Sequence, residues 1–326
     1  ARLLQRMTGL LARTGPDAQD VRIEGVVGLG HAMLRTTTES EHERQPLTRD
    51  GQVFITADAR VDGRTELMRR LEGHATGSLV GSSDAELILR AYEVWGDACV
   101  DHLIGDFAFV IWDGRRRRLF CARDQFGLKP FYWACVGSCL VVSNSLNCLR
   151  LHPVVSERLD DTVMADLLVL GYNPDLTTTV FDDIKRLPPA HVLTWTGQGV
   201  QTRRYWTLPI DERIRYRRQE EYVEHFNAVL DEAVSDRIRT DRAGIFLSGG
   251  LDSTSIAASV RRSRSRAALP QLPAFTYVYD RLLPDEERKY ATIAARALDI
   301  PVEFLAADDY EPCLLYTSPS PRDVEE

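Results

Sequence analysis

The chain has 326 residues, 44% of them hydrophobic, and 40 Lys and Arg against 48 Asp and Glu give it a formal net charge of -8. This length allows one large domain or two of ordinary size, and the apolar content with mixed charge excludes a disordered chain. The acidic balance argues against a nucleic-acid-binding surface. No run approaches 18 consecutive apolar residues, so we expect no membrane-spanning helix.

The six cysteines predict reduced, mostly buried thiols in a cytoplasmic protein. No CxxC pair occurs and no His stands at zinc-ligand spacing, which argues against a metal site built on cysteine. The first six residues lack the basic-then-apolar layout of a secretory signal, and there is no initiator Met. We therefore expect the natural chain to begin earlier.

From about residue 21 to residue 206 the chain is rich in short apolar runs bounded by turn residues, which predicts β-strands. The pair Asp113-Gly114 separates two such runs and predicts a hairpin. The expected strands are 53–56, 107–112, 118–122, 131–134, 139–143 and 191–195. Apolar residues at three- and four-residue steps predict helices over 2–11, 65–71, 85–94 and 162–170. This half is therefore expected to be an α+β domain.

From about residue 220 the pattern alternates between helix and strand. Helices are expected over 221–239, 252–260 and 285–298, and strands over 244–247 and 274–279. This order predicts a parallel sheet with crossover helices. Residues 312–326 fit neither pattern, and we interpret them as a foreign or disordered tail on a chain cut near Glu311.

The strongest motif is the run LSGGLDST, residues 247 to 254, between an expected strand and an expected helix. Its two glycines let backbone amides approach phosphate oxygens closely. Ser248, Ser253 and Thr254 add hydroxyl donors, and the helix that follows presents unpaired amides with a partial positive charge. Asp252 is placed to hold Mg²⁺ against the phosphates. The absence of a Lys beside the Ser excludes a Walker-type loop.

This loop resembles that of the ATP pyrophosphatases, specifically of the asparagine synthetase family. Shorter motifs of the first half resemble that family's amino-terminal domain in order and spacing: Gly15-Pro16-Asp17, Leu29-Gly30-His31, Ser83 to Glu86, Gly105 to Phe109 and Arg123 to Tyr132. The resemblance implies an αββα glutaminase-like (Ntn-type) sandwich followed by a truncated α/β ATP-pyrophosphatase domain. We expect a glutamine amidotransferase type 2-like domain over 1–208, a linker over 209–219 and an ATP-binding domain over 220–311.

In this family ATP and Mg²⁺ activate a carboxylate as an acyl-adenylate, which an amine then attacks. The resemblance implies a nucleotide site made of Leu247, Ser248, Gly249, Gly250, Leu251, Asp252, Ser253, Thr254, Tyr277 and Val278, with Asp252 as the Mg²⁺ ligand. It places the family's remaining catalytic residues beyond residue 326, so no catalytic residue is assigned within the chain and we expect the 326 residues alone to be inactive. The expected partner is a small-molecule or peptide carboxylate, and a homodimer is compatible with the resemblance.

The first domain departs from the family pattern at its glutamine site. The family's amino-terminal Cys nucleophile is absent, its Asn-Gly-Glu stretch aligns with Ala57-Asp58-Ala59, and its carboxylate-gripping Arg aligns with Met33. Asp84, which would hold the amino group of glutamine, is present, although a helix N-cap or first-turn carboxylate explains it equally well. Each lost partner leaves a polar group of glutamine unpaired, at about 1–3 kcal/mol. We therefore expect weak or absent glutamine hydrolysis.

These observations predict ATP-dependent amide-bond formation of the asparagine synthase (glutamine-hydrolysing) type. One alternative is a glutamine-independent intramolecular amide ligase, like lasso-peptide cyclases and β-lactam synthetases, and the segment 276–287 resembles the lasso-cyclase form. Another alternative is a non-catalytic nucleotide-binding partner. His31 is interpreted as a packed strand histidine, and Asp285 and Glu286 as first-turn carboxylates in preference to a nucleotide-proximal role.

Overall fold

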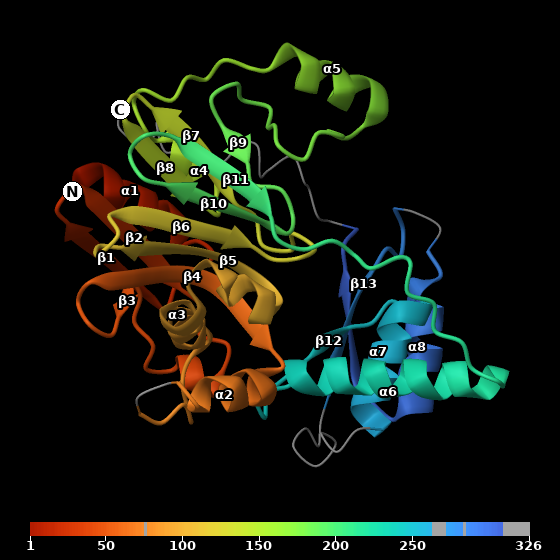
Figure 1. Cartoon of the computed structure of the whole chain (residues 1–326). Helices are drawn as coiled ribbons and strands as arrows, with labels where there is room; N and C mark the ends of the chain where they lie inside the picture. The colour runs from red at the N-terminus through yellow and green to blue at the C-terminus, as the bar shows by residue number, and fades with distance from the viewer. Residues whose placement is uncertain (75–76, 263–271, 283–284, 309–326) are drawn as a thin grey trace. The chain divides into compact units, whose positions relative to one another are not determined.

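The computed structural model describes residues 1–74, 77–262, 272–282 and 285–308. Contacts between residues divide the chain into two compact units, unit 1 from Ala1 to Arg213 and unit 2 from Ile214 to Glu326. Each unit has its own hydrophobic core, and each is described by itself (Figure 1).

Unit 1 contains a six-stranded antiparallel sheet. Its strands lie in the order β11 (Val200–Arg204), β10 (His191–Trp195), β6 (Arg118–Arg123), β5 (Ile104–Asp113), β4 (Val53–Asp62) and β3 (Leu47–Thr48). The hairpin predicted at Asp113-Gly114 joins β5 to β6, with Asp113 opposite Arg118. Arg117 closes that turn at a φ of 50°.

Two smaller antiparallel sheets form the next layer of unit 1. One pairs β1 (Ala18–Glu24) with β2 (Val27–Met33), and the other has the order β8 (Cys139–Ser143), β7 (Tyr132–Val136) and β9 (Lys185–Arg186). One apolar cluster lies between the layers and takes side chains from β2, β4, β5, β6, β7 and β10. Buried apolar residues on both faces of the large sheet therefore make it a central layer.

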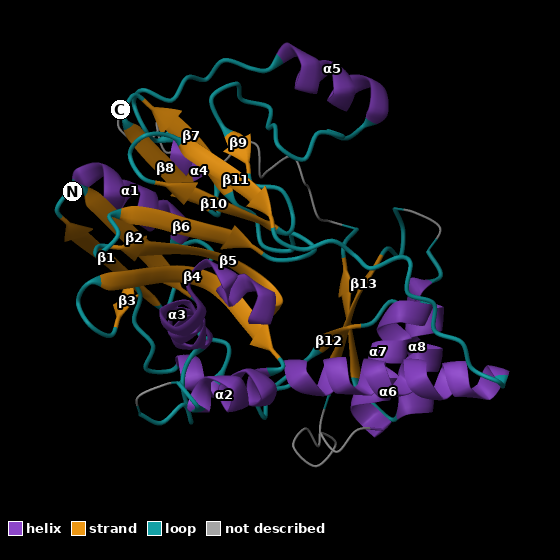
Figure 2. Cartoon of the chain, in the orientation of Figure 1, coloured by secondary structure: helices purple, strands orange, loops and turns teal. Residues whose placement is uncertain are grey.

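Helices cover the two outer faces of these sheets (Figure 2). The helices α2 (Arg64–Glu72) and α3 (Asp84–Trp95) and the 3-10 segment Gly96–His102 pack on the six-stranded sheet. The helices α1 (Arg2–Leu11) and α4 (Leu146–Arg150) pack on β7 and β8. The result is a helix–sheet–sheet–helix sandwich, which confirms the predicted αββα class.

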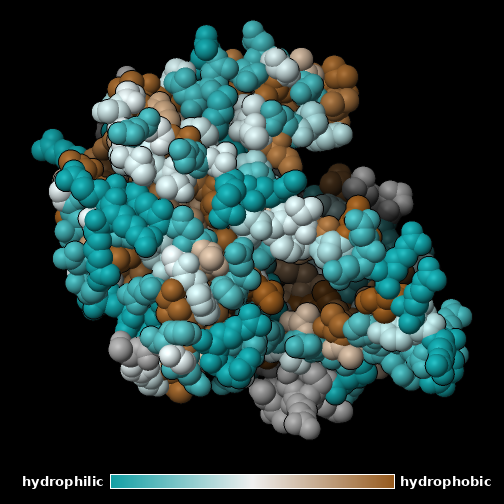
Figure 3. All heavy atoms as spheres, viewed as in Figure 1, coloured by the Kyte–Doolittle hydropathy of each residue, from teal (hydrophilic) through white to brown (hydrophobic). Residues whose placement is uncertain are grey.

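A fifth helix of unit 1, α5 (Asp161–Leu170), has clear end signals. The Asp160 carboxylate accepts from the amides of Thr162 and Val163, and Gly171 ends the helix at a φ of 78°. Its last turn is apolar but exposed, with Leu168 at 83% and Val169 at 80%, and Figure 3 shows apolar side chains gathered there.

In its described residues, unit 2 contains one parallel sheet with helices packed on it. The parallel strands β12 (Ile245–Phe246), β13 (Ala274–Val278) and β14 (Val302–Ala306) lie side by side in that order. The helices α6 (Gln219–Arg237), α7 (Leu251–Arg262) and α8 (Glu287–Leu298) share one apolar cluster with these strands. The alternation of strand and crossover helix confirms the predicted α/β class.

Several expected boundaries need correction. The strand expected at 53–56 continues to Asp62, because the residues up to Asp62 stay paired with β5 as far as Ile104. The helix expected from residue 285 begins at Glu287, because the Asp285 carboxylate accepts from the Glu287 amide. The strands β1, β2, β11 and β14 were not singled out individually from the sequence. The tail, 312–326, lies outside the described residues.

The thiols and helices bear on two further expectations. Of the five cysteines that the structure describes, all free, three are buried and two, Cys135 and Cys139, are exposed. Among the described residues, none of the helices combines the length and the apolar character needed to cross a lipid bilayer.

Candidate functional site

The loop between β12 and α7 is anchored to the neighbouring strand β13. Leu247 is buried, its amide donates to the Phe275 carbonyl at 2.9 Å, and its carbonyl accepts from the Thr276 hydroxyl at 2.6 Å. The Thr276 side chain is itself buried. These two bonds continue the sheet one residue past β12 and fix where the loop begins.

Gly249 meets two geometric demands that a larger residue cannot meet. Its φ is +75°, in the left-handed region that favours glycine. A Cβ at this position would lie 2.4 Å from the backbone carbon of Tyr290 and 2.6 Å from the amide nitrogen of Ala291. The backbone of α8 therefore passes directly against the loop. At Gly250 an added Cβ would meet only the Ser248 hydroxyl, at 3.2 Å.

The loop amides are not consumed by carbonyl groups within the loop. The Ser248 amide donates to the Ser253 hydroxyl and the Gly250 amide donates to the Ser248 hydroxyl, both at 3.2 Å, and the two hydroxyl oxygens lie 3.1 Å apart. Within the described part of the chain, the amides of Gly249, Leu251 and Asp252 donate to no protein acceptor. Amides and rotatable hydroxyls at the start of a helix form a ready anion site.

Two other predicted residues lie differently. The Asp252 side chain is exposed in the first turn of α7, where it is free to meet a metal-bound phosphate. The Thr254 hydroxyl oxygen is buried and has no hydrogen-bond partner among the described residues, so it is not open to the loop surface as the two Ser hydroxyls are.

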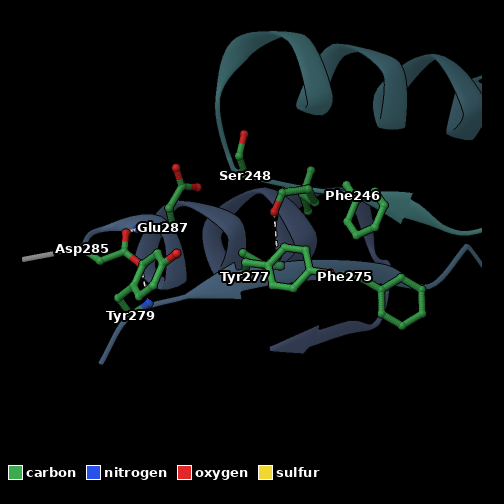
Figure 4. A pocket seen from close by; sticks show the side chains of 9 residues that line it. Phe246, Ser248, Phe275, Tyr277, Tyr279, Asp285 and Glu287 are labelled. Carbon is green, nitrogen blue, oxygen red and sulfur yellow. Dashed lines mark hydrogen bonds between the residues drawn. The ribbon is translucent and has the colours of Figure 1, made fainter. Parts of the chain in front are cut away.

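A pocket of about 620 Å³ opens beside the loop (Figure 4). It is lined by Phe246, Leu247, Ser248, Phe275, Thr276, Tyr277, Tyr279, Asp285 and Glu287. The volume is in the range of small-molecule sites. Of the two β13 residues predicted for the nucleotide, the exposed Tyr277 lines the pocket, whereas Val278 is fully buried and is not among the lining residues. The ring of Tyr277 stacks on Phe246 with centroids 5.9 Å apart.

The sequence interpretation underrated the acidic start of α8. Asp285 accepts from the Tyr279 amide and the Glu287 amide, both at 2.8 Å, so it ties the end of β13 to the helix. Glu287, which was not singled out as a site residue, lines the pocket, and its Oε2 is buried with no partner among the described residues. A signal existed in the sequence, because acidic residues after the second strand of a nucleotide-binding fold often face the ligand.

The second predicted site, at Asp84 in unit 1, is occupied by the protein itself. Asp84 is the first residue of α3 and Ser83 is the N-cap, since the Ser83 hydroxyl accepts from the Glu86 amide. The Asp84 carboxylate is buried and bound by the Arg64 guanidinium, whose other amino group donates to the Ser82 carbonyl. A cation from α2 thus lies where the resemblance would place the ammonium group of glutamine.

The neighbouring positions are also satisfied internally. The Gln45 side chain accepts from the Ala57 amide at 2.6 Å and donates to the Ala57 carbonyl at 3.1 Å. The Asp58 carboxylate binds the Lys129 ammonium at 2.6 Å and accepts from the Asn144 amide group. Backbone and side-chain groups aligned with the family's glutamine-holding stretch therefore have partners within unit 1.

Two titratable groups near this site are perturbed by burial. Burial raises the pKa of the Glu43 carboxyl, against opposing hydrogen bonds from Ser83 and Gln45. Burial lowers the pKa of His31 to about 4, against the opposing charge of Asp58. The His31 Nδ1 lies 3.0 Å from the Thr56 hydroxyl. His31 is therefore a neutral, packed strand residue at ordinary pH.

Neither site is a preformed metal centre. No group of three or more His, Cys, Asp or Glu side chains gathers at metal-binding distance among the described residues. The residues at the loop fit a metal held jointly by Asp252 and phosphate oxygens, which is how Mg²⁺ usually binds with nucleotides.

Comparison with known families gives the fold and the site a context. A model of the glutamine amidotransferase domain matches residues 1–206, more than half of the chain, and a model of asparagine synthase matches residues 225–313. The chain belongs to the asparagine synthetase family. As a member it carries the amidotransferase sandwich first and the asparagine synthase sheet second, in the predicted order.

The family's named relatives are considerably longer than this chain. It is 33% identical to asparagine synthetase [glutamine-hydrolyzing] 3 of Bacillus subtilis, over 78% of this chain and 42% of that protein. It is 31% identical to a putative asparagine synthetase of Mycobacterium tuberculosis, over 77% and 37%, and 26% identical to amidase chyE of Penicillium rubens, over 94% and 47%. The chain therefore spans about two fifths to one half of the length of these relatives.

Proposed function

We propose that this protein forms amide bonds at the expense of ATP, through an acyl-adenylate. The observation that supports this most directly is the loop from Ser248 to Ser253, whose amides donate to no carbonyl of the described residues and whose Gly249 has the backbone of α8 against it. A pyrophosphate needs such a concave surface of amides and hydroxyls. The family names of its relatives, asparagine synthetases, agree with a carbon–nitrogen ligase.

The reaction has two steps. A substrate carboxylate oxygen attacks the α-phosphorus of ATP, a P–O bond to the β-phosphate breaks, and pyrophosphate leaves. An amine nitrogen then attacks the acyl carbon, loses a proton, and AMP leaves with the carbon–oxygen bond electrons. The loop residues of this chain act in the first step, because their amides and the Ser248 and Ser253 hydroxyls stabilise charge that builds on the departing pyrophosphate.

Mg²⁺ would supply positive charge that offsets the phosphate charge when bound. Asp252 is the residue of the loop that would hold it, from the first turn of α7. The exposure of this carboxylate suits a metal that arrives with the nucleotide.

The test is ATP–pyrophosphate exchange, measured on the protein expressed from its complete reading frame because its relatives are longer than this chain. We expect exchange that requires a carboxylate substrate and that the Ser248→Ala and Ser253→Ala double variant reduces at least tenfold. Nucleotide binding without exchange, across amino-acid and peptide carboxylates, would contradict the proposal and favour a non-catalytic nucleotide-binding partner.

The contacts at Asp84 favour a second form of this function, in which the amine does not come from glutamine. The Arg64 guanidinium already neutralises the Asp84 carboxylate, and Ala57, Ala59 and Met33 stand at positions aligned with the family's Asn, Glu and Arg. Glutamine would have to displace a buried ion pair and would still lack partners for its other polar groups. We propose that the amidotransferase sandwich serves as a scaffold and that the amine belongs to the substrate.

This second form is tested with free ammonia and glutamine. Incubation with aspartate, ATP and either nitrogen source is expected to give no asparagine, and glutamine is expected to give no glutamate. Clear asparagine formation from glutamine would contradict the scaffold role while leaving the adenylation proposal in place.

A further inference from the structure

Glu287 has an unexplained position in unit 2. It lies in the first turn of α8 and lines the pocket beside the loop, and its Oε2 is buried without a partner among the described residues. A buried carboxylate oxygen without a hydrogen bond is costly, and each such group calls for an explanation such as a ligand, an ion or an ordered water. The other oxygen, Oε1, is not among these buried atoms and accepts no hydrogen bond from the described residues, so it is the oxygen that a donor entering the pocket can reach.

The rest of the pocket wall explains why Glu287 is held in this position. Asp285 uses both carboxylate oxygens on backbone amides, one of them the amide of Glu287 itself. The adjacent Glu286 binds the Lys289 ammonium at 2.9 Å at the surface. Asp285 and Glu287 both line the pocket, but both Asp285 oxygens already accept from backbone amides, so among the described contacts Glu287 is the lining carboxylate that keeps an oxygen for a ligand.

The charge of Glu287 restricts which part of a nucleotide it can meet. A carboxylate repels phosphates, so the phosphates belong at the amides and hydroxyls around Ser248. Figure 4 shows Glu287, Tyr279 and Asp285 on one side of Ser248, with Phe246 and Phe275 on the other. The donors that ATP offers are its two ribose hydroxyls and its adenine amino group, and two adjacent hydroxyls can both donate to the accessible Oε1, which has two lone pairs.

We infer that Glu287 is a specificity-determining residue that accepts hydrogen bonds from the ribose hydroxyls of the bound nucleotide. The ribose then lies at the Tyr279 and Glu287 end of the pocket, and the triphosphate runs from there to Ser248. This inference rests on the proposed function, because it requires that the loop binds a nucleoside triphosphate.

The test compares binding of ATP, 2′-deoxy-ATP and 3′-deoxy-ATP to the 326-residue chain by calorimetry, with Mg²⁺ present. The wild type should bind the deoxy nucleotides about tenfold more weakly than ATP, as expected for a lost hydrogen bond to a charged group. Glu287→Gln and Glu287→Ala should weaken ATP about tenfold and reduce the preference over the deoxy nucleotides to less than about threefold. Glu286→Gln makes the same chemical change one residue away and should keep both properties.

The outcomes separate this inference from the proposed function. If the wild type binds ATP but the Glu287 variants keep the full preference for the ribose hydroxyls, the inference is wrong and the nucleotide site stands. Purine riboside triphosphate lacks the adenine amino group. If the wild type prefers ATP to this nucleotide and the Glu287 variants lose that preference, Glu287 contacts the base and the inference is wrong. If the wild type binds none of these nucleotides, both proposals fail. Thermal melting of each variant shows whether it is folded.

Discussion

The two predicted binding regions of this chain differ in what their polar groups contact. At Asp84 in unit 1, the carboxylate, its neighbours and the aligned backbone are bound by Arg64, Gln45 and other groups of the same unit. At the loop in unit 2, the Ser248 and Gly250 amides donate, among the described residues, only to the Ser253 and Ser248 hydroxyls, each at 3.2 Å. This contrast fits our proposals that the region at Asp84 no longer takes a ligand and that the loop does.

This difference is informative because the motif residues alone do not reveal it. Both regions keep recognisable family residues, Asp84 in one and the glycine-rich loop in the other. The cost of an unpaired buried charge is large enough that a retained Asp84 needs some cation, supplied either by a ligand or by the chain. Arg64, twenty residues earlier on another helix, supplies it here.

The largest expected effect is at the loop in unit 2. Gly249→Ala forces a side chain into the left-handed region and against the backbone of Tyr290 and Ala291. The conformational cost of about 1–2 kcal/mol and the overpacking cost of about 1–3 kcal/mol together give about 3 kcal/mol of lost stability in unit 2. Binding of ATP should fall at least thirtyfold, measured by calorimetry, with hydrogen exchange of α7 and α8 reporting the local stability.

Gly250→Ala is the matched control for this change. Its φ is not in the left-handed region, and its added Cβ meets only a hydroxyl at 3.2 Å. It should leave the exchange rates of α7 and α8 close to those of the wild type. If both variants lower the stability equally, the loop excludes side chains for a reason other than the approach of α8.

The region at Asp84 is tested by removing the Arg64 guanidinium that binds it. Arg64→Met keeps most of the apolar stem but leaves Asp84 buried and charged, which should cost about 3 kcal/mol of unfolding free energy. Urea unfolding followed by tryptophan fluorescence measures this in unit 1 alone, because all five tryptophans precede residue 214.

Two further variants decide the cause of that loss. Adding Asp84→Asn to Arg64→Met removes the buried charge that Arg64 no longer balances and should restore most of the stability. Arg69→Met removes a surface partner of Glu66 in the same helix and should change the urea midpoint little. If the double variant is as unstable as Arg64→Met, the ion pair is not what holds this pocket closed.

Much of the fold was predictable from local patterns, and the failures have physical causes. The helix at residues 2–11 and the strands at 139–143 and 191–195 have the predicted bounds, since their apolar spacing is regular. The strand β1 has only three of seven residues partly buried and β14 sits at a sheet edge, so neither shows a regular apolar pattern.

The loop and its geometry were also accessible from the sequence, because glycines, hydroxyls and a following helix are local features. The role of Arg64 was not, since it depends on a contact between elements. For Glu287 the sequence offered only a general signal, the acidic residues after the second strand, and not which of their carboxylates keeps an unpaired oxygen. Arg64 on α2 binds Asp84 on α3, and Asp285 accepts from the Tyr279 amide just after β13 and from the Glu287 amide at the start of α8. Sequence spacing carries no information on such long-range pairs.

The stability of unit 1 should also fall in acid because of His31. Its pKa is lowered to about 4 by burial, from the ordinary value of 6.5, so the folded unit binds fewer protons than the unfolded one between these values. The stability from a neutral His31 is complete above about pH 6.5 and is lost as the pH falls toward 4. Because the ring is partly exposed, we expect about 2 kcal/mol of loss between pH 7 and 4.5.

The measurement compares urea unfolding of the wild type and of His31→Gln at both pH values, followed by tryptophan fluorescence. The wild type should lose about 2 kcal/mol more than His31→Gln over this range. His74→Gln removes an exposed imidazole and should follow the wild type. Parallel losses in the wild type and His31→Gln would show that acid acts on unit 1 through other groups.

The smallest predicted effect concerns the hydrogen bond that anchors the loop in unit 2 to β13. Thr276 is buried, and its hydroxyl donates to the Leu247 carbonyl at 2.6 Å, where the loop leaves β12. Thr276→Val preserves the shape but leaves that carbonyl without its donor, at about 1 kcal/mol. Hydrogen exchange of residues 247–254 should accelerate and ATP binding should weaken about fivefold. Thr276→Ser keeps the hydroxyl and should retain slow exchange, whereas equal behaviour of the two variants would mean that the loop holds its shape without this bond.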